Sequence, residues 1–164
     1  MPLFRSRRNE LVVPNSDGTF AVMLNENGQA VIERILATVE DLLMSNPDDP
    51  SLARLHPTAY ADDAERDGAY QLLAGEELRT NRHAEITAMR HSMGRNDLSE
   101  DELWGWLRTF NAVRLVAAAR CGMDTDEDFT EVDLDALDDD GLFWLEVFEL
   151  ANFIQYSLLD ALGD

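Results

Sequence analysis

Large apolar residues recur at helical spacing along much of the chain, and this periodicity limits the fold more than any other feature of the sequence. Between residues 27 and 46 one stripe is made by Val31, Ile32, Ile35, Leu36, Val39, Leu42 and Leu43. Between residues 100 and 121 a second stripe is made by Trp106, Phe110, Val113 and Ala117. Side chains spaced in this way share one face of an α-helix, and that face must be buried against other elements. The sequence therefore predicts a mainly α fold.

The last stretch, residues 142–162, is apolar on most sides of the helix that it predicts. So wide an apolar surface is typical of a central core helix, or of a helix that also contacts a second subunit. Four of its aromatic residues are Phe143, Trp144, Phe148 and Phe153. They cover more helix directions than one small core would fill, so we expect a homodimer.

The N-terminal region has a β-type pattern. Two short apolar runs, residues 11–13 and 20–24, flank the turn-forming sequence Pro-Asn-Ser-Asp-Gly at residues 14–18, which predicts a hairpin. The fold class expected is thus a helical bundle of about five helices with a small N-terminal β-hairpin. One domain is expected for 164 residues. Its parts are a hairpin region (1–26), a helical body (27–123), an acidic connection (124–140) and a C-terminal apolar helix (141–164).

Start and stop signals divide the helical body. Gly75 is expected to separate a short helix over residues 65–73 from a longer one over 76–93, which has few large apolar residues and so would lie across the surface. Ser99 and Glu102 have the spacing of a capping box, in which each side chain bonds the other residue's backbone N–H. Gly122 is typical of the residue that follows a helix.

Charge excludes several classes of function. The chain has 33 acidic residues against 13 basic ones, all of them Arg, for a net charge of −20. A chain of this charge is repelled by nucleic acids and anionic membranes. The absence of Lys removes Schiff-base chemistry and the phosphate-binding Lys of a P-loop. No basic residue follows Arg120, so the acidic charge is concentrated in the C-terminal quarter.

Cysteine content and targeting signals favour a cytoplasmic protein. Cys121 is the only cysteine, so no intramolecular disulfide can form. No apolar run of signal-peptide or membrane-spanning length is present. Cys121 remains a candidate redox residue, although it lies near the predicted end of a helix, where the helix dipole disfavours a thiolate.

Metal and cofactor sites have little support in the sequence. Asp124, Asp126 and Asp128 resemble the opening of a calcium loop, but the sixth position is Phe129, where a calcium loop has Gly. The three histidines have no recognised ligand spacing with one another or with Cys121. No catalytic, cofactor-binding or metal-binding residue is therefore expected.

The arginines of the middle of the chain are candidates for recognition. Arg79, Arg82, His83, Arg90 and Arg95 lie among acidic residues, and pairing at i, i+3 or i+4 would make them a salt-bridged surface. Their alternative role is binding an anion or an acidic partner. Arg114 lies among apolar residues and needs a carboxylate, for which Asp62 or Asp63 is the expected partner.

Two blocks of sequence resemble a known family. Residues 52–63, Leu-Ala-Arg-Leu-His-Pro-Thr-Ala-Tyr-Ala-Asp-Asp, followed by Tyr70-Gln71-Leu72-Leu73 and Leu78-Arg79, resemble the central block of an actinobacterial family of unknown function. That family was later labelled AosR-like oxidative stress transcriptional regulators. Residues 106–115 resemble its second block, a Leu-Asn-Asp-Val-Arg-Leu type of run from which Phe110 and Ala112 depart.

The resemblance implies a cytoplasmic, non-enzymatic protein that acts in a redox-linked way with the transcription machinery, through a sigma factor or another transcription component. The redox part of the family's label rests on two closely spaced cysteines. This chain has only Cys121, which leaves an intermolecular disulfide as the thiol chemistry open to it.

Three functions follow as hypotheses. The first is a regulatory protein-interaction module whose acidic surface suits the basic face of a DNA-binding protein. The second is an enzyme or small-ligand protein with a polar site at Tyr60, Asp62, Asp63 and Arg114. The third is direct DNA binding through Arg5, Arg7, Arg8 and the arginines between 79 and 95, which the net charge disfavours.

Overall fold

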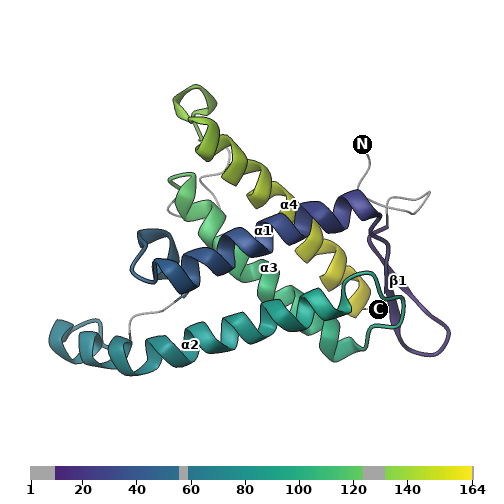
Figure 1. The fold of residues 1–164 in the computed structure, drawn as a ribbon, viewed down its shortest axis with the longest axis horizontal. Helices are drawn as coiled ribbons and strands as arrows, with labels where there is room; N and C mark the ends of the chain where they lie inside the picture. The colour runs from purple at the N-terminus through teal and green to yellow at the C-terminus, as the bar shows by residue number, and fades with distance from the viewer. Residues whose placement is uncertain (1–9, 56–58, 124–131, 164) are drawn as a thin grey trace.

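The computed structural model describes residues 10–55, 59–123 and 132–163, which form a helical bundle with a small hairpin at one end (Figure 1). The helices are α1 (Glu26–Ser45), α2 (Ala64–Ser92), α3 (Glu100–Arg120) and α4 (Asp139–Gly163). Two short 3-10 helices, η1 (Pro50–Leu55) and η3 (Leu134–Ala136), lie between them. The hairpin pairs β1 (Val12–Pro14) with β2 (Phe20–Val22). The mainly α class with a minor N-terminal hairpin is confirmed.

The hairpin forms where the sequence predicts it. β1 and β2 are antiparallel, with Val12 opposite Val22 and Pro14 opposite Phe20. Gly18 has a φ of 82° in the turn, a conformation that glycine adopts without steric cost. Phe20 also pairs with Leu98, just before α3, through two backbone hydrogen bonds of 2.8 and 2.9 Å. This third strand-like segment fixes the hairpin to the bundle, since a hairpin alone would be only marginally stable.

The core is centred on α3, which contacts α1, α2, α4 and η1. Trp106 and Phe110 of α3 and Phe148 of α4 are among the largest fully buried side chains. The indole Nε1 of Trp106 donates a hydrogen bond of 2.7 Å to Ser92 Oγ, so the polar atom of this core residue is satisfied. The predicted core stripe of Trp106, Phe110, Val113 and Ala117 is confirmed.

Both ends of α3 follow the predicted signals, and side-chain caps also begin other helices. Asn25 caps α1 by accepting a hydrogen bond of 2.8 Å from Gly28 N. Ser99 and Glu102 form the reciprocal capping box at the start of α3. Gly122 follows α3 with a φ of 75°. These local hydrogen bonds satisfy backbone groups that no helical partner can reach.

The separation predicted at Gly75 is wrong, because α2 is one helix from Ala64 to Ser92. Glycine lowers helix stability by only about 1 kcal/mol and removes no backbone donor, so a helix can continue through it. The large buried residues of α2, Ile86 and Met89, lie in its C-terminal half. The N-terminal half extends beyond the other helices at one end of the molecule (Figure 1).

Within the described parts of the chain, no helix combines the length and the apolar character that crossing a bilayer requires.

Candidate functional site

The first predicted site residues, Tyr60, Asp62 and Asp63, lie at the N-terminus of α2. Asp63 is the N-cap, and its carboxylate accepts a hydrogen bond of 3.0 Å from Arg66 N. The Arg66 guanidinium lies 4.1 Å from the centre of the Tyr60 ring, a cation–π contact. Asp62 is exposed. These contacts begin the helix and fix its first turn, which is a structural role.

The expected ion pair of Arg114 with Asp62 or Asp63 is wrong. Among the described residues the Asp63 carboxylate caps α2, whereas Arg114 Nη2 donates to Asn111 Oδ1 at 3.2 Å. The error arises because α2 is continuous, and its first turn lies at the end that extends past the bundle. The structure therefore does not assemble Tyr60, Asp62, Asp63 and Arg114 into one polar site.

Most of the candidate recognition residues of the middle of the chain, which we call the arginine stripe (Arg79, Arg82, His83, Arg90 and Arg95), are paired with carboxylates. Arg90 bonds Glu33 at 2.8 Å and Glu40 at 2.7 Å, and His83 Nδ1 lies 2.6 Å from Glu40, so these groups tie α2 to α1. Burial opposes the charge of Arg90, but the two carboxylates outweigh it and raise the pKa of the guanidinium.

The remaining members of the stripe differ in their surroundings. Arg95 pairs with Asp97 and Glu102 at 3.0 and 2.6 Å, next to the capping box of α3. Arg82 pairs with Glu85 at 3.0 Å. Arg79 is in no ion pair with another described residue, and its Nη1 lies beside Gly75. The salt-bridged surface is thus the better description of this face.

Cys121 is the C-cap residue of α3 and is buried, with 8% of its surface exposed. Burial, together with the nearby Asp140 carboxylate, raises the pKa of its thiol to about 11. Arg120 does not offset this effect, because it is paired with Asp49 at 2.8 Å. A neutral, buried thiol is a poor nucleophile and a poor partner for disulfide exchange.

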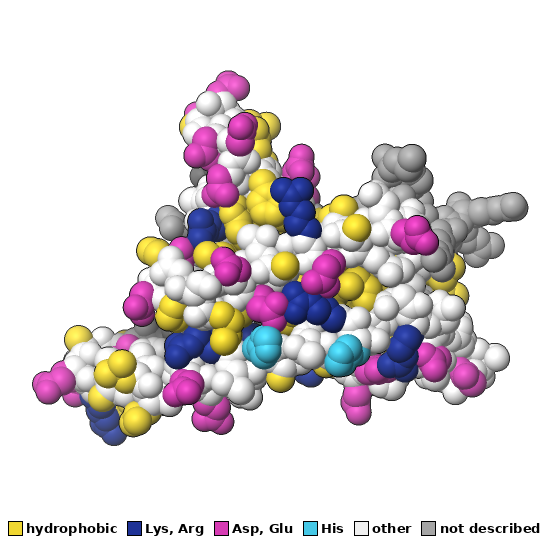
Figure 2. Space-filling model, viewed as in Figure 1, with side chains coloured by type: hydrophobic (Ala, Val, Ile, Leu, Met, Phe, Trp, Pro, Cys, Tyr) yellow, Lys and Arg dark blue, Asp and Glu magenta, His cyan; other side chains and the backbone are white. Residues whose placement is uncertain are grey.

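An exposed apolar surface on α2 was not recognised as a site from the sequence. Leu72 and Leu73 are 84% and 83% exposed, more than any other large apolar residue described. Glu76 and Glu77 follow one turn later and are also exposed. Figure 2 shows hydrophobic side chains at this extended end of the molecule, with acidic ones beside them. We call Leu72, Leu73, Glu76 and Glu77 the α2 surface. The sequence signal that could have identified this surface is a pair of adjacent Leu residues in a segment otherwise rich in charged residues.

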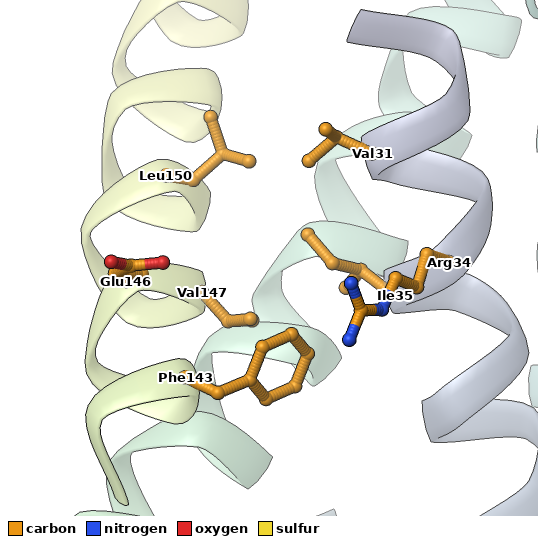
Figure 3. A pocket seen from close by; sticks show the side chains of 7 residues that line it. All are labelled: Val31, Arg34, Ile35, Phe143, Glu146, Val147 and Leu150. Carbon is orange, nitrogen blue, oxygen red and sulfur yellow. The ribbon is translucent and has the colours of Figure 1, made fainter. Parts of the chain in front are cut away.

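A hollow of about 330 Å³ lies between α1 and α4 (Figure 3). Its walls are Val31, Arg34, Ile35, Phe143, Glu146, Val147 and Leu150. The Arg34 guanidinium of α1 lies 5.5 Å from the centre of the Phe143 ring of α4. Glu146 is the acidic residue of the α4 wall. The lining is mainly apolar and holds no nucleophile, so it offers no catalytic constellation.

The predicted calcium-loop residues Asp124, Asp126 and Asp128 lie outside the described residues, as does His56. The same holds for Arg5, Arg7 and Arg8, which the hypothesis of direct DNA binding names. The described residues contain no group of three or more His, Cys, Asp or Glu side chains placed to hold a metal ion.

Comparison with known proteins gives one result. A family model described as a domain of unknown function, DUF2017, matches residues 5–162. No curated protein matches the chain significantly, and no solved structure does so either.

Proposed function

The chain belongs to the DUF2017 family, and on that premise we propose that it is a non-enzymatic protein-interaction module that binds its partner through the α2 surface. One observation carries this proposal. Leu72 and Leu73 are almost fully exposed on a helix that extends beyond the bundle. Burial of a Leu side chain contributes about 1.5–3 kcal/mol, so a partner that covers both residues gains substantial affinity.

Charge defines the chemistry of the partner. Glu76 and Glu77 adjoin the two leucines, and the whole chain carries a net charge of −20. A partner segment with apolar residues flanked by Arg or Lys matches this surface, and electrostatic attraction speeds such an association. Basic segments of this kind are common in DNA-binding proteins. The resemblance to AosR-like regulators favours a transcription component, such as a sigma factor, in a cytoplasmic stress response.

The two other hypotheses lack such support. Arg114 and Asp63 have separate local partners, which weakens the proposal of a shared polar site. Arg82, Arg90 and Arg95 are engaged with carboxylates, which weakens the proposal of direct DNA binding.

We also propose a homodimer, with α4 as the contact. Trp144 and Phe148 are buried within the single chain, which accounts for part of the apolar surface of this helix. Leu142 and Tyr156 are 41% and 79% exposed and remain for a second copy. Light scattering coupled to gel filtration measures the mass that decides this point.

The α2 surface is tested by capturing partners from the native host with the wild-type chain and with a Leu72→Ser, Leu73→Ser double variant. The expected result is a basic transcription protein bound by the wild type and lost from the double variant. Titration of that purified protein should show at least tenfold weaker binding. Met44→Ser, at another exposed apolar residue, is the matched control and should bind normally. Equal binding by the double variant with unchanged helicity would reject the proposal.

A further inference from the structure

A second hollow, of about 450 Å³, opens where α2, α3 and α4 meet. It is lined by Arg82, Trp104, Leu107, Arg108, Asn111, Gln155 and Leu159. Its volume is within the range of sites that hold small molecules. It differs from the hollow between α1 and α4 because polar donors and an aromatic ring converge on it.

Two guanidinium groups in this hollow are held by one carboxylate. Arg82 Nη1 donates to Glu85 Oε2 at 3.0 Å, and Arg108 Nε donates to Glu85 Oε1 at 2.8 Å. Each guanidinium has five N–H donors in a planar fork, so one contact with Glu85 leaves further donors. Arg82 and Arg108 thus share a single carboxylate, which leaves this wall of the hollow with an excess of positive charge on a chain whose net charge is −20. This position therefore attracts an anion.

Asn111 adds a neutral donor to the same wall. Its Oδ1 accepts hydrogen bonds from Arg114 Nη2 at 3.2 Å and from Gln155 Nε2 at 3.4 Å. With its acceptor engaged by two donors, the amide Nδ2 is the end left to contact a ligand.

The rest of the hollow is apolar. Trp104 and Leu159 are 38% and 50% exposed, and Leu107 is half-buried. The indole Nε1 of Trp104 is bonded to Glu100 at 3.3 Å, so its ring rather than its N–H is available for contact. A flat apolar group can pack on this ring.

We propose that this hollow binds a small organic anion. A single carboxylate or phosphate group contacts Arg82, Arg108 and the Asn111 amide, and a flat apolar body packs on Trp104 and Leu107. The carboxylates of Glu85 and Glu100 adjoin the hollow and repel further negative charge, which favours one anionic group over an acidic peptide. The site is separate from the α2 surface and does not depend on the function proposed for it.

The test is titration of the ¹⁵N-labelled full chain with phenyl phosphate, benzoate, inorganic phosphate and neutral benzyl alcohol. The signal of the Trp104 indole N–H, assigned with Trp104→Phe, reports binding. Phenyl phosphate or benzoate should saturate this signal, and the tighter of the two identifies the anionic group. Inorganic phosphate and benzyl alcohol should each bind at least tenfold more weakly, because phosphate lacks the flat apolar body and benzyl alcohol lacks the anionic group.

Variants locate the anion. Arg82→Gln and Arg108→Gln should each weaken binding of the better probe about tenfold or more. Arg66→Gln, which removes an arginine that lies over Tyr60, should leave it unchanged. Equal binding of benzyl alcohol, no effect of either arginine variant, the absence of a saturable Trp104 shift, or tighter binding of a tetraglutamate peptide would overturn the proposal.

Discussion

At the scale of single residues, Cys121 shows how placement decides chemistry. From the sequence, this thiol is a candidate redox residue near the predicted end of a helix. The fold buries it at the end of α3, beside Gly141 and the Asp140 carboxylate, while Arg120 is paired with Asp49. Burial and the Asp140 carboxylate both favour the neutral thiol, because each raises the pKa of the Cys121 side chain.

The raised thiol pKa predicts a stability that falls at alkaline pH. Between the ordinary value of 9.0 and the folded value of about 11, the unfolded chain loses the thiol proton while the folded chain keeps it. Unfolding therefore releases a proton in this window, and stability should fall by up to about 1.4 kcal/mol per pH unit. Urea unfolding at pH 7.5, 9.0 and 10.5 measures this slope.

Cys121→Ala is the control for this slope. The free energy of unfolding of this variant at pH 7.5 is the reference for its values at higher pH. Its loss of stability between pH 9 and 10.5 should be smaller than that of the wild type. No ammonium side chain titrates in this window, because the chain has no lysine. Equal slopes in the two proteins would contradict the assignment, as would rapid labelling of native Cys121 by a thiol reagent at pH 7.5.

At the scale of elements, α2 carries the largest difference between prediction and structure. Gly75 lies inside this helix, and a Cβ built on it would meet only the flexible Arg79 guanidinium, at 3.4 Å. Because no backbone or core atom occupies that space, no neighbouring element requires a glycine here for close packing. The glycine therefore lowers the stability of the helix without a packing benefit.

Gly75→Ala is therefore expected to stabilise the protein by about 0.5–1 kcal/mol, since alanine loses less backbone entropy in a helix. The change should appear in urea or thermal unfolding, and the helical signal should rise slightly. Gly122→Ala is the opposite control: its φ of 75° is strained for alanine, so this variant should be destabilised. Destabilisation by Gly75→Ala would indicate that a bend at Gly75 is required.

The elements were predictable where local chemistry decides them. The turn at Gly18, the Asn25 cap, the Ser99–Glu102 capping box and the end of α3 at Gly122 all depend on residues close in sequence. The partners of Arg90 were not predictable, because Glu33 and Glu40 reach this arginine only through the packing of α1 on α2. The exposure of Leu72 and Leu73 likewise depends on where the bundle ends, which periodicity along one helix does not encode.

At the scale of the whole molecule, two electrostatic effects oppose each other. Ion pairs such as Arg90 with Glu33 and Glu40 stabilise the packing of α1 on α2. The net charge of −20, with no basic residue after Arg120, adds a repulsion that grows as the chain becomes compact. Each exposed ion pair contributes little to the free energy of unfolding. The repulsion acts between many acidic side chains at longer distances, and salt screens interactions at those distances.

Repulsion should dominate, so the melting temperature is expected to rise with NaCl between 10 and 150 mM. A rise of roughly 2–4 °C corresponds to about 1 kcal/mol for a chain of this size. A Glu149→Gln, Asp160→Asn double variant removes two exposed charges from α4, and it should melt higher than the wild type at 10 mM NaCl. This difference should shrink at 150 mM, where the Debye length falls to about 8 Å. A melting temperature that falls with salt would instead show that the ion pairs outweigh the repulsion, and the acidic surface would then cost the fold little.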